Sequence, residues 1–180
     1  MKHVVRKAFY DHEKEEKWIN EMSAKGLALT DVSWCRYVFS ETINNEYSYR
    51  IELLDKLPTH PESKAYINFL EENGVEYVSS YMRWVYLRKK SSEGDFDIYT
   101  DIDSKIKYYK KINVFWTSVM LLELVAVLIN LIVSMTHTKF FNINLIFAFL
   151  LFILVIKFWS LGIPIRKKIK ELKKEKSIRE

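Results

Sequence analysis

The chain has 180 residues, with 28 Lys and Arg against 23 Asp and Glu, and 49% of its residues are apolar. Four Gly and three Pro are too few for a disordered or low-complexity chain, and a single Cys excludes an intramolecular disulfide and any multi-cysteine metal site. Residues 1–111 carry 18 Lys and Arg against 19 Asp and Glu, so the net charge of +5 comes from residues 112–180.

Strand and helix patterns alternate over the first hundred residues. Residues 4–10 are rich in β-branched and aromatic side chains, which favours a strand. Asp11 then suits the N-cap of a helix in which Trp18 and Ile19 share one face. Gly26 ends this helix, because the left-handed position after a helix favours Gly. The pattern predicts a strand that leads directly into an amphipathic helix.

A second group of strands is predicted further along. Residues 27–39 favour a strand with a break near residues 31–33. Asn44 and Asn45 form a turn signal, and residues 47–53 alternate between apolar and polar side chains. We expect the strands on either side of this turn to pair as a hairpin.

A second helix is predicted after residues 59–62, which match the S/T-x-x-E capping box with Pro in the first turn. It ends at Gly74. Residues 75–78 and 82–87 favour further strands, and residues 96–100 a short final one.

The resulting order is β-α-β-β-α-β with extra strands, which is the order of the ferredoxin-like sandwich. We therefore expect a cytoplasmic α+β domain over residues 1–104, in which two helices cover one face of a mostly antiparallel sheet. Residues 105–111 are expected to form a helical linker to the segment that follows.

Two apolar segments dominate the rest of the chain. Residues 112–135 and 140–163 each contain one charge, Glu123 in the first and Lys157 in the second. As helices they would each be about 36 Å long and would cross a hydrocarbon core of about 30 Å. A core helix of a soluble protein has a polar stripe, which both segments lack. Because only residues 136–139 separate them, they predict a transmembrane hairpin.

Basic residues flank the hairpin on one side. The connecting turn contains only His137 and Lys139, and the opening sequence has no apolar segment typical of a signal peptide. The positive-inside rule therefore places both termini in the cytoplasm. Trp116 and Trp159 are predicted to anchor the cytoplasmic ends of the spans in the headgroup layer. The basic flanks are Lys105, Lys107, Lys110 and Lys111 before the first span, and Arg166, Lys167, Lys168 and Lys170 after the second.

The basic tail after the second span, residues 164–180, suits contact with lipid. Basic clusters beside a span attract anionic headgroups with about 1 kcal/mol per charge. We expect Arg166, Lys167, Lys168 and Lys170 to contact these headgroups. The alternative is that the tail serves only as a positive-inside anchor.

Glu123 and Lys157 give the most specific local hypothesis. By helical rise they lie about 17 Å and about 12 Å from the inner face, within side-chain reach of each other. Charges at such depth are costly and usually pair, so we expect an ion pair across the hairpin. The alternatives are that Lys157 reaches the headgroups while Glu123 is protonated, or that Glu123 pairs with another subunit.

The sequence contains no recognisable catalytic or ligand-binding constellation. It has no GxGxxG, GxxxxGK[ST] or GxSxG pattern, and Cys35 lies in an apolar context typical of a buried, unreactive thiol. The acidic residues at positions 95, 97, 101 and 103 lack EF-hand spacing and fit a solvated edge strand. We expect no enzymatic activity, no metal site and no cofactor. None of the four His (His3, His12, His60 and His137) has another His or Cys at metal-ligand spacing.

Several segments in order resemble an uncharacterised family of membrane proteins of Gram-positive bacteria that contain a domain of unknown function. The segments are RKAF at residues 6–9, EEKWINEMSAKGLAL at residues 15–29, YINFLEENGVE at residues 66–76, FDIYTD at residues 96–101 and SKI at residues 104–106. The position after Gly26 is typically Trp in this family but is Leu27 here, which keeps an apolar residue.

This resemblance implies a cytoplasmic domain tethered to the bacterial inner membrane by two or more helices. Family genes often neighbour those of PadR-like transcriptional regulators, which implies such a regulator or another membrane protein as a partner. No catalytic residues are carried over from the family.

We expect a non-enzymatic, membrane-anchored sensory or interaction protein whose partners are anionic lipid and a protein, without direct binding of nucleic acid. One alternative is a small-ligand-binding domain, with an apolar molecule held between sheet and helices. The other is a subunit of a homo-oligomeric channel or transporter, suggested by Glu123 and Lys157.

Overall fold

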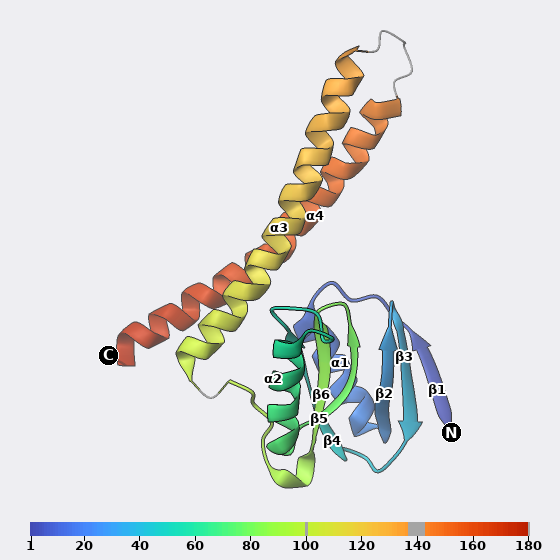
Figure 1. Cartoon of the computed structure of the whole chain (residues 1–180), viewed down its shortest axis with the longest axis vertical. Helices are drawn as coiled ribbons and strands as arrows, with labels where there is room; N and C mark the ends of the chain where they lie inside the picture. Colours follow the sequence, from blue (N-terminus) through green and yellow to red (C-terminus); the bar gives the residue numbers. More distant parts are fainter. Residues whose placement is uncertain (100, 137–142, 180) are drawn as a thin grey trace. The chain divides into compact units, whose positions relative to one another are not determined.

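The computed structural model describes residues 1–99, 101–136 and 143–179. The chain divides into two units, Met1–Ile98 and Tyr99–Glu180 (Figure 1). We call the first the N-terminal unit and the second the helical hairpin. The N-terminal unit mixes strands with helices, whereas the hairpin consists of two long helices.

The N-terminal unit contains two copies of one arrangement, which is a strand, a helix and a two-stranded hairpin. The first copy comprises β1 (Lys2–Arg6), α1 (His12–Ala24), β2 (Leu27–Ser33) and β3 (Arg36–Glu41). The second comprises β4 (Tyr47–Leu53), α2 (Pro61–Glu72), β5 (Glu76–Tyr81) and β6 (Trp84–Lys90), followed by the 3-10 turn η1 (Ser91–Glu93). Each copy forms an antiparallel sheet with its last strand in the middle, in the orders β1-β3-β2 and β4-β6-β5.

Local backbone features recur at matching positions of the two copies. Gly26 and Gly74 follow the two helices with φ of +77° and +81°, a conformation that Gly adopts without steric cost. Both β2 and β5 contain a register shift in their pairing with the central strand. The turns after these strands contain Cys35 and Met82, each with positive φ. The two copies therefore form an internal structural repeat.

The α+β class is confirmed, but the strand pairing corrects two expectations. A ferredoxin-like fold has one sheet, whereas the strands here form two sheets. The predicted hairpin between residues 27–39 and 47–53 is also wrong. Residues 27–39 turn back on themselves at Trp34 and Cys35, and β4 pairs with β6. Alternation along a strand fixes which face is buried but does not choose the neighbouring strand.

Helix α1 lies between the two sheets. Its Ile19 is fully buried in a core with Phe39 of the first sheet and with Tyr49 and Tyr86 of the second. Helix α2 packs on the opposite face of the second sheet, against Leu87, because successive residues of a strand face opposite sides. The two helices therefore cover opposite faces of the second sheet, and α1 also packs on the first sheet, whose strand β2 contacts β5 of the second (Figure 1).

The helix starts follow the sequence closely. The side chain of Asp11 accepts hydrogen bonds from first-turn N–H groups of α1, which confirms the predicted N-cap. On α2 the N-cap is His60 rather than Thr59, because Pro61 occupies the first helical position.

Residues 94–99 form no strand, which differs from the predicted final strand, and Thr100 lies outside the described residues. Phe96 is instead buried beside Leu70 and Val75, and Ile98 packs at the edge of the same core. These apolar side chains close the end of the α2 core without joining a sheet.

The hairpin consists of α3 (Ile102–Thr136) and α4 (Ile143–Arg179), which pack against each other. Both are long and apolar enough to cross a membrane, with mean hydropathy of 2.3 and 2.5 in their most apolar windows. Only 6% and 17% of these windows are buried, whereas a core helix of a soluble protein is mostly buried. The predicted turn at residues 136–139 lies, beyond Thr136, outside the described residues.

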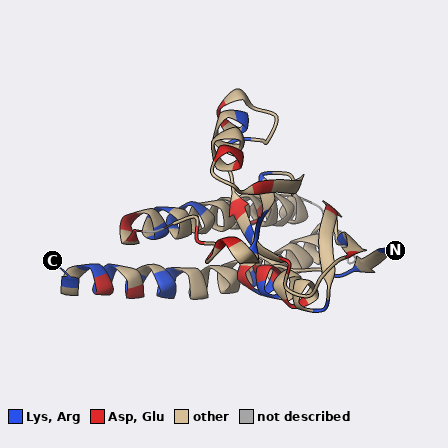
Figure 2. Ribbon diagram, turned by 90° about the horizontal axis from the view of Figure 1, so that it is seen from below, with Lys and Arg blue, Asp and Glu red and all other residues tan. Residues whose placement is uncertain are grey.

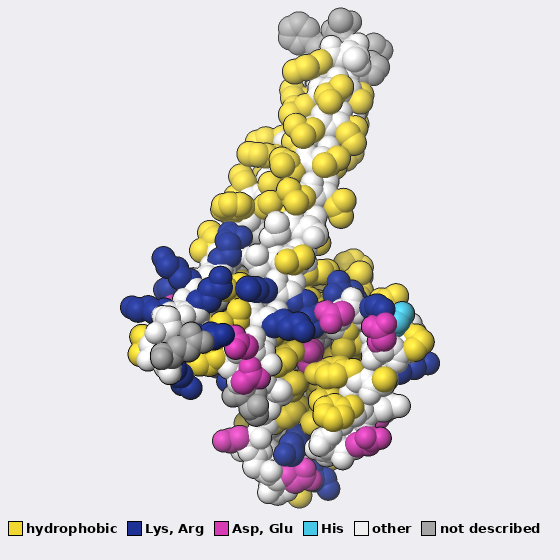
Figure 3. All heavy atoms as spheres, turned by 60° about the vertical axis from the view of Figure 1, so that its left-hand side comes forward, with side chains coloured by type: hydrophobic (Ala, Val, Ile, Leu, Met, Phe, Trp, Pro, Cys, Tyr) yellow, Lys and Arg dark blue, Asp and Glu magenta, His cyan; other side chains and the backbone are white. Residues whose placement is uncertain are grey.

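Both helices continue beyond their apolar segments as a polar extension, residues 102–111 and 164–179, which we call the stalk. The predicted basic tail is thus helical, and α4 runs through Pro164 without ending. Ile106, Ile165 and Leu172 are buried in the stalk. Along the rest of the hairpin Ile112, Val127 and Ala148 are buried, whereas many large apolar side chains face outward (Figure 3).

Candidate functional site

The first candidate site lies where the apolar segments meet the stalk. Trp116 of α3 stacks on Phe158 of α4, with ring centroids 5.6 Å apart and ring planes at 23°. The next residue, Trp159, points away from this contact and is 55% exposed. One predicted anchor therefore joins the two helices, and the other offers its indole ring to the surroundings.

Arg166 is folded back along α4 onto Trp159. Its guanidinium carbon lies 4.6 Å from the indole centroid, and its Nη2 donates to the Trp159 carbonyl oxygen at 3.2 Å. Gly162 makes room for this arrangement, because a Cβ at that position would collide with Nη1 of Arg166. The absence of a side chain at Gly162 thus leaves room for the Arg166 cation over an exposed aromatic ring.

The other three predicted headgroup residues, Lys167, Lys168 and Lys170, are exposed on the stalk. Lys176 joins the two helices of the stalk, since its Nζ lies 2.8 Å from Oδ1 of Asp103 on α3. Figure 2 shows that Lys and Arg are spread along the stalk end of α4 with Glu between them. This end of the hairpin therefore presents a basic surface with an ion pair between its two helices.

Glu123 and Lys157 lie on α3 and α4, and both are half-buried. The Trp116–Phe158 stack sets the helix register, from which we place them about 9 Å apart along the hairpin axis. The ion pair between them stays a prediction.

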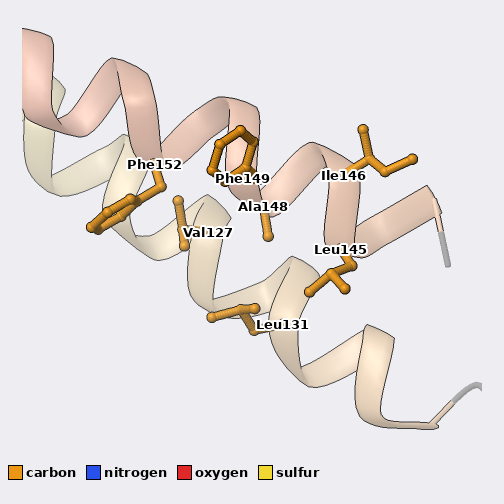
Figure 4. Close-up of a pocket in the computed structure, with 7 residues that line it drawn as sticks. All are labelled: Val127, Leu131, Leu145, Ile146, Ala148, Phe149 and Phe152. Atoms are coloured by element: carbon orange, nitrogen blue, oxygen red, sulfur yellow. The ribbon is translucent and has the colours of Figure 1, made fainter.

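An apolar groove runs between α3 and α4 near the connecting end of the hairpin (Figure 4). Its volume is about 490 Å³. No charged side chain is among its lining residues, so it suits a hydrocarbon chain or another apolar helix. The lining comprises Val127 and Leu131 of α3 and Leu145, Ile146, Ala148, Phe149 and Phe152 of α4.

The N-terminal unit contains a buried polar cluster that sequence reasoning missed. Oε1 of Glu15 accepts hydrogen bonds from the hydroxyl groups of Tyr37 at 2.7 Å and Tyr86 at 2.6 Å. Burial raises the pKa of the Glu15 carboxyl, and the two hydrogen bonds partly oppose the rise. Burial and the carboxylate together raise the pKa of both tyrosines, so they remain hydroxyl donors. The three side chains come from distant segments, which leaves no local sequence signal.

His12 lies nearby at the start of α1. Its ring stacks on Trp84 with centroids 5.4 Å apart. Burial lowers the pKa of His12, which favours the neutral imidazole. Beside this region, Lys7 Nζ lies 4.8 Å from the ring centroids of both Phe9 and Trp18.

A polar stripe of α1 covers the outer edge of β4. Glu16 accepts a hydrogen bond from the backbone N–H of Ile51 at 2.8 Å. Asn20 both accepts from the N–H and donates to the carbonyl of Tyr49, at 2.9 Å and 3.1 Å. Ser23 donates to the carbonyl of Tyr47 at 2.6 Å. The stripe satisfies an edge that would otherwise be open to pairing with another strand.

The residues that sequence analysis considered for metal or thiol chemistry are not brought together. Across residues 1–99, 101–136 and 143–179, no group of three or more His, Cys, Asp or Glu side chains is placed to hold a metal ion. Cys35 lies in the turn between β2 and β3 and is half-buried, which corrects the expectation of a buried strand residue.

Comparison with known proteins identifies one relationship. Residues 11–121 match a family model described as "Protein of unknown function (DUF2812)". No curated protein and no solved structure matches the chain. The match begins at the N-cap of α1 and ends within α3.

Proposed function

The chain belongs to the DUF2812 family, and we propose that it is a sensory or interaction protein anchored in the inner membrane of a bacterium. In this proposal the hairpin crosses the membrane twice, the N-terminal unit and the stalk lie in the cytoplasm, and the protein has no catalytic activity of its own.

The outward-facing apolar surface of α3 and α4 carries the proposal. Large apolar side chains are exposed from Val114 to Met135 and from Ile143 to Ile163. Soluble proteins rarely expose contiguous apolar patches of this extent. Contact with lipid explains why these residues are left unburied.

The orientation rests on charge. The stalk is rich in Lys and Arg, and the positive-inside rule favours the cytoplasm for such segments. Trp159 and Arg166 then lie at the headgroup layer, where Arg166, Lys167, Lys168 and Lys170 contact anionic phosphates.

The partner follows from the family resemblance described above. A PadR-like transcriptional regulator or another membrane protein is the candidate that we propose for the N-terminal unit. To hold such a protein at the membrane, the N-terminal unit needs a folded docking surface but no catalytic activity.

Thiol labelling in intact cells tests the membrane topology, because Cys35 is the single Cys of the chain. A membrane-impermeant maleimide is expected to leave Cys35 unlabelled until the cells are broken. The variant Cys35→Ser with His137→Cys is expected to be labelled in intact cells. Labelling of Cys35 from outside, or recovery of the full chain in the soluble fraction without detergent, would refute the proposal.

The groove between α3 and α4 favours a second candidate function, a subunit of an oligomeric channel or transporter. An apolar groove that opens to the bilayer suits the packing of another helix. Glu123 would then pair with Lys157 or with another subunit. A strictly monomeric protein in nanodiscs would eliminate this candidate.

A further inference from the structure

The two sheets of the N-terminal unit have four edge strands, and the chain itself covers three of them. The edge of β4 is covered by α1. The edges of β2 and β5 face each other, with Oγ of Ser79 accepting from the N–H of Val32 at 3.1 Å. The hydroxyl of Tyr49 accepts a further β2 hydrogen bond from the N–H of Leu29 at 2.9 Å. The fourth edge is β1.

The register shows which groups β1 leaves open. The N–H of Lys7 donates to the Cys35 carbonyl at 2.9 Å, so alternate residues of β1 point their backbone groups toward β3. The N–H and carbonyl groups of Lys2, Val4 and Arg6 therefore point outward. Among residues 1–99, 101–136 and 143–179, no side chain hydrogen-bonds to this edge in the way that α1 bonds to β4.

The internal repeat shows what such an edge accepts. β1 and β4 occupy equivalent places, each as the outer strand next to the last strand of its copy. On β4 the occupant is a helix with Glu16, Asn20 and Ser23 at the spacing i, i+4, i+7. That spacing places carboxylate, amide and hydroxyl groups on one helix face, matched to successive outward groups of the strand.

The charge around β1 selects among occupants. Lys2 and Arg6 are exposed on the strand, and Val4 between them is 54% exposed. A second copy pairing antiparallel through β1 would set Lys2 opposite Arg6, which repels. The helix α2 of another copy is also unsuitable, because Lys64 stands where α1 has Glu16. A carboxylate-rich helix satisfies both the backbone donors and the cations.

We propose that the outer edge of β1 is the docking site for an acidic amphipathic helix of a partner protein, bound as α1 is bound to β4. This inference rests on the proposed function and specifies its docking surface. The partner helix contributes a Glu or Asp and an amide side chain to the outward N–H and carbonyl groups of Lys2 and Val4, and further carboxylates to Lys2 and Arg6.

The experiment uses the full chain in phosphatidylcholine nanodiscs and a synthetic peptide of residues 11–25. This peptide contains the polar stripe of α1, flanked by further Asp and Glu residues. A lactam bridge between its Lys17 and Glu21, which lie outside the stripe, stabilises the helix. Fluorescence anisotropy of the labelled peptide gives the affinity, and hydrogen exchange with mass spectrometry gives the site.

We expect saturable binding with slower amide exchange in residues 2–6. The variant Lys2→Glu with Arg6→Glu is expected to weaken binding about tenfold, since both side chains are exposed and opposite charge is lost. Lys64→Glu, an exposed change on α2, is the matched control and should leave binding unchanged. A peptide with Glu16→Lys and Asn20→Leu should not bind.

Three results would overturn the inference. These are the absence of binding, exchange protection confined to residues 47–53 because the peptide displaces α1 from β4, and equal affinity for the double variant and the wild type. None of them bears on membrane anchorage, because thiol labelling in cells tests that separately.

Discussion

At the scale of single residues, Gly162 decides where a charge is placed. Ala at this position would strengthen the helix, since Gly costs about 1 kcal/mol relative to Ala in a helix interior. Gly is used here because Arg166 lies over the position and reaches Trp159. The glycine therefore serves side-chain placement and not backbone freedom.

Gly162→Ala should reduce binding of phosphatidylglycerol about fivefold, equivalent to about 1 kcal/mol for one displaced headgroup contact. Native mass spectrometry of protein purified in detergent measures the lipid that is retained. Arg166→Gln should show a similar loss. Ile163→Ala, at an exposed neighbouring position, is the control. If Gly162→Ala retains lipid like the wild type while Arg166→Gln does not, the role of Gly162 is wrong.

Glu15 links stability to pH. The pKa of the Glu15 carboxyl is raised in the folded state, so the folded state binds more protons than the unfolded state. The stability that this difference provides is therefore lost as the pH rises from 4.5, the ordinary pKa of this group, through the raised pKa of the folded state. Glu15→Gln removes this dependence while keeping an oxygen that accepts from Tyr37 and Tyr86.

The expected result is a thermal unfolding midpoint that falls less for Glu15→Gln than for the wild type as pH rises from about 4.5 to about 7. Near-ultraviolet circular dichroism of the full chain in detergent follows the transition. Glu21→Gln, an exposed change on the same helix, should follow the wild type. Parallel curves for Glu15→Gln and the wild type would contradict the assignment.

At the scale of elements, α1 connects the two copies of the repeat. It belongs to the first copy by sequence, but its polar stripe hydrogen-bonds to β4 of the second. The repeat also supplies a natural comparison, because Asn68 of α2 stands at the position of Asn20 and is exposed. The same residue type at equivalent helix positions thus has different surroundings.

Asn20→Ala should destabilise the N-terminal unit by about 1–3 kcal/mol, because it leaves the N–H and carbonyl of Tyr49 without their partner. Asn68→Ala should change stability by less than about 0.5 kcal/mol. Denaturant unfolding in detergent, followed by near-ultraviolet circular dichroism, measures both. Equal effects of the two substitutions would show that the stripe contributes nothing to stability.

At the scale of the whole molecule, sequence reasoning succeeded where the signal is local. The cap at Asp11, the stop at Gly26 and the apolar segments of α3 and α4 were all predicted, because each depends on neighbouring residues. The repeat was missed because its two copies share few residue types beyond Gly26 and Gly74. Strand order and the Glu15 cluster depend on contacts between distant segments, which periodicity does not encode.

If the hairpin spans the membrane, replacing an exposed apolar residue by Arg should weaken membrane retention in the apolar segment of α3 but not in the stalk. Leu128→Arg, within the apolar segment of α3, should raise the free energy of insertion by up to about 3 kcal/mol. Ile178→Arg, in the stalk, should have no effect. The measurement is the fraction of protein that stays in membranes after carbonate extraction. If the two variants are retained equally, α3 does not lie in the bilayer at this position.

The position of α1 between two sheets also has a consequence for synthesis. When a nascent chain has emerged only as far as β3, it can form the first sheet and α1 but lacks β4. The polar stripe of α1 and the core residue Ile19 then remain partly uncovered. Cotranslational folding of the first copy therefore stays incomplete until the second emerges. The first apolar segment follows soon afterwards in the sequence. If the hairpin spans a membrane as we propose, completion of this fold and delivery to the insertion machinery fall close together in time.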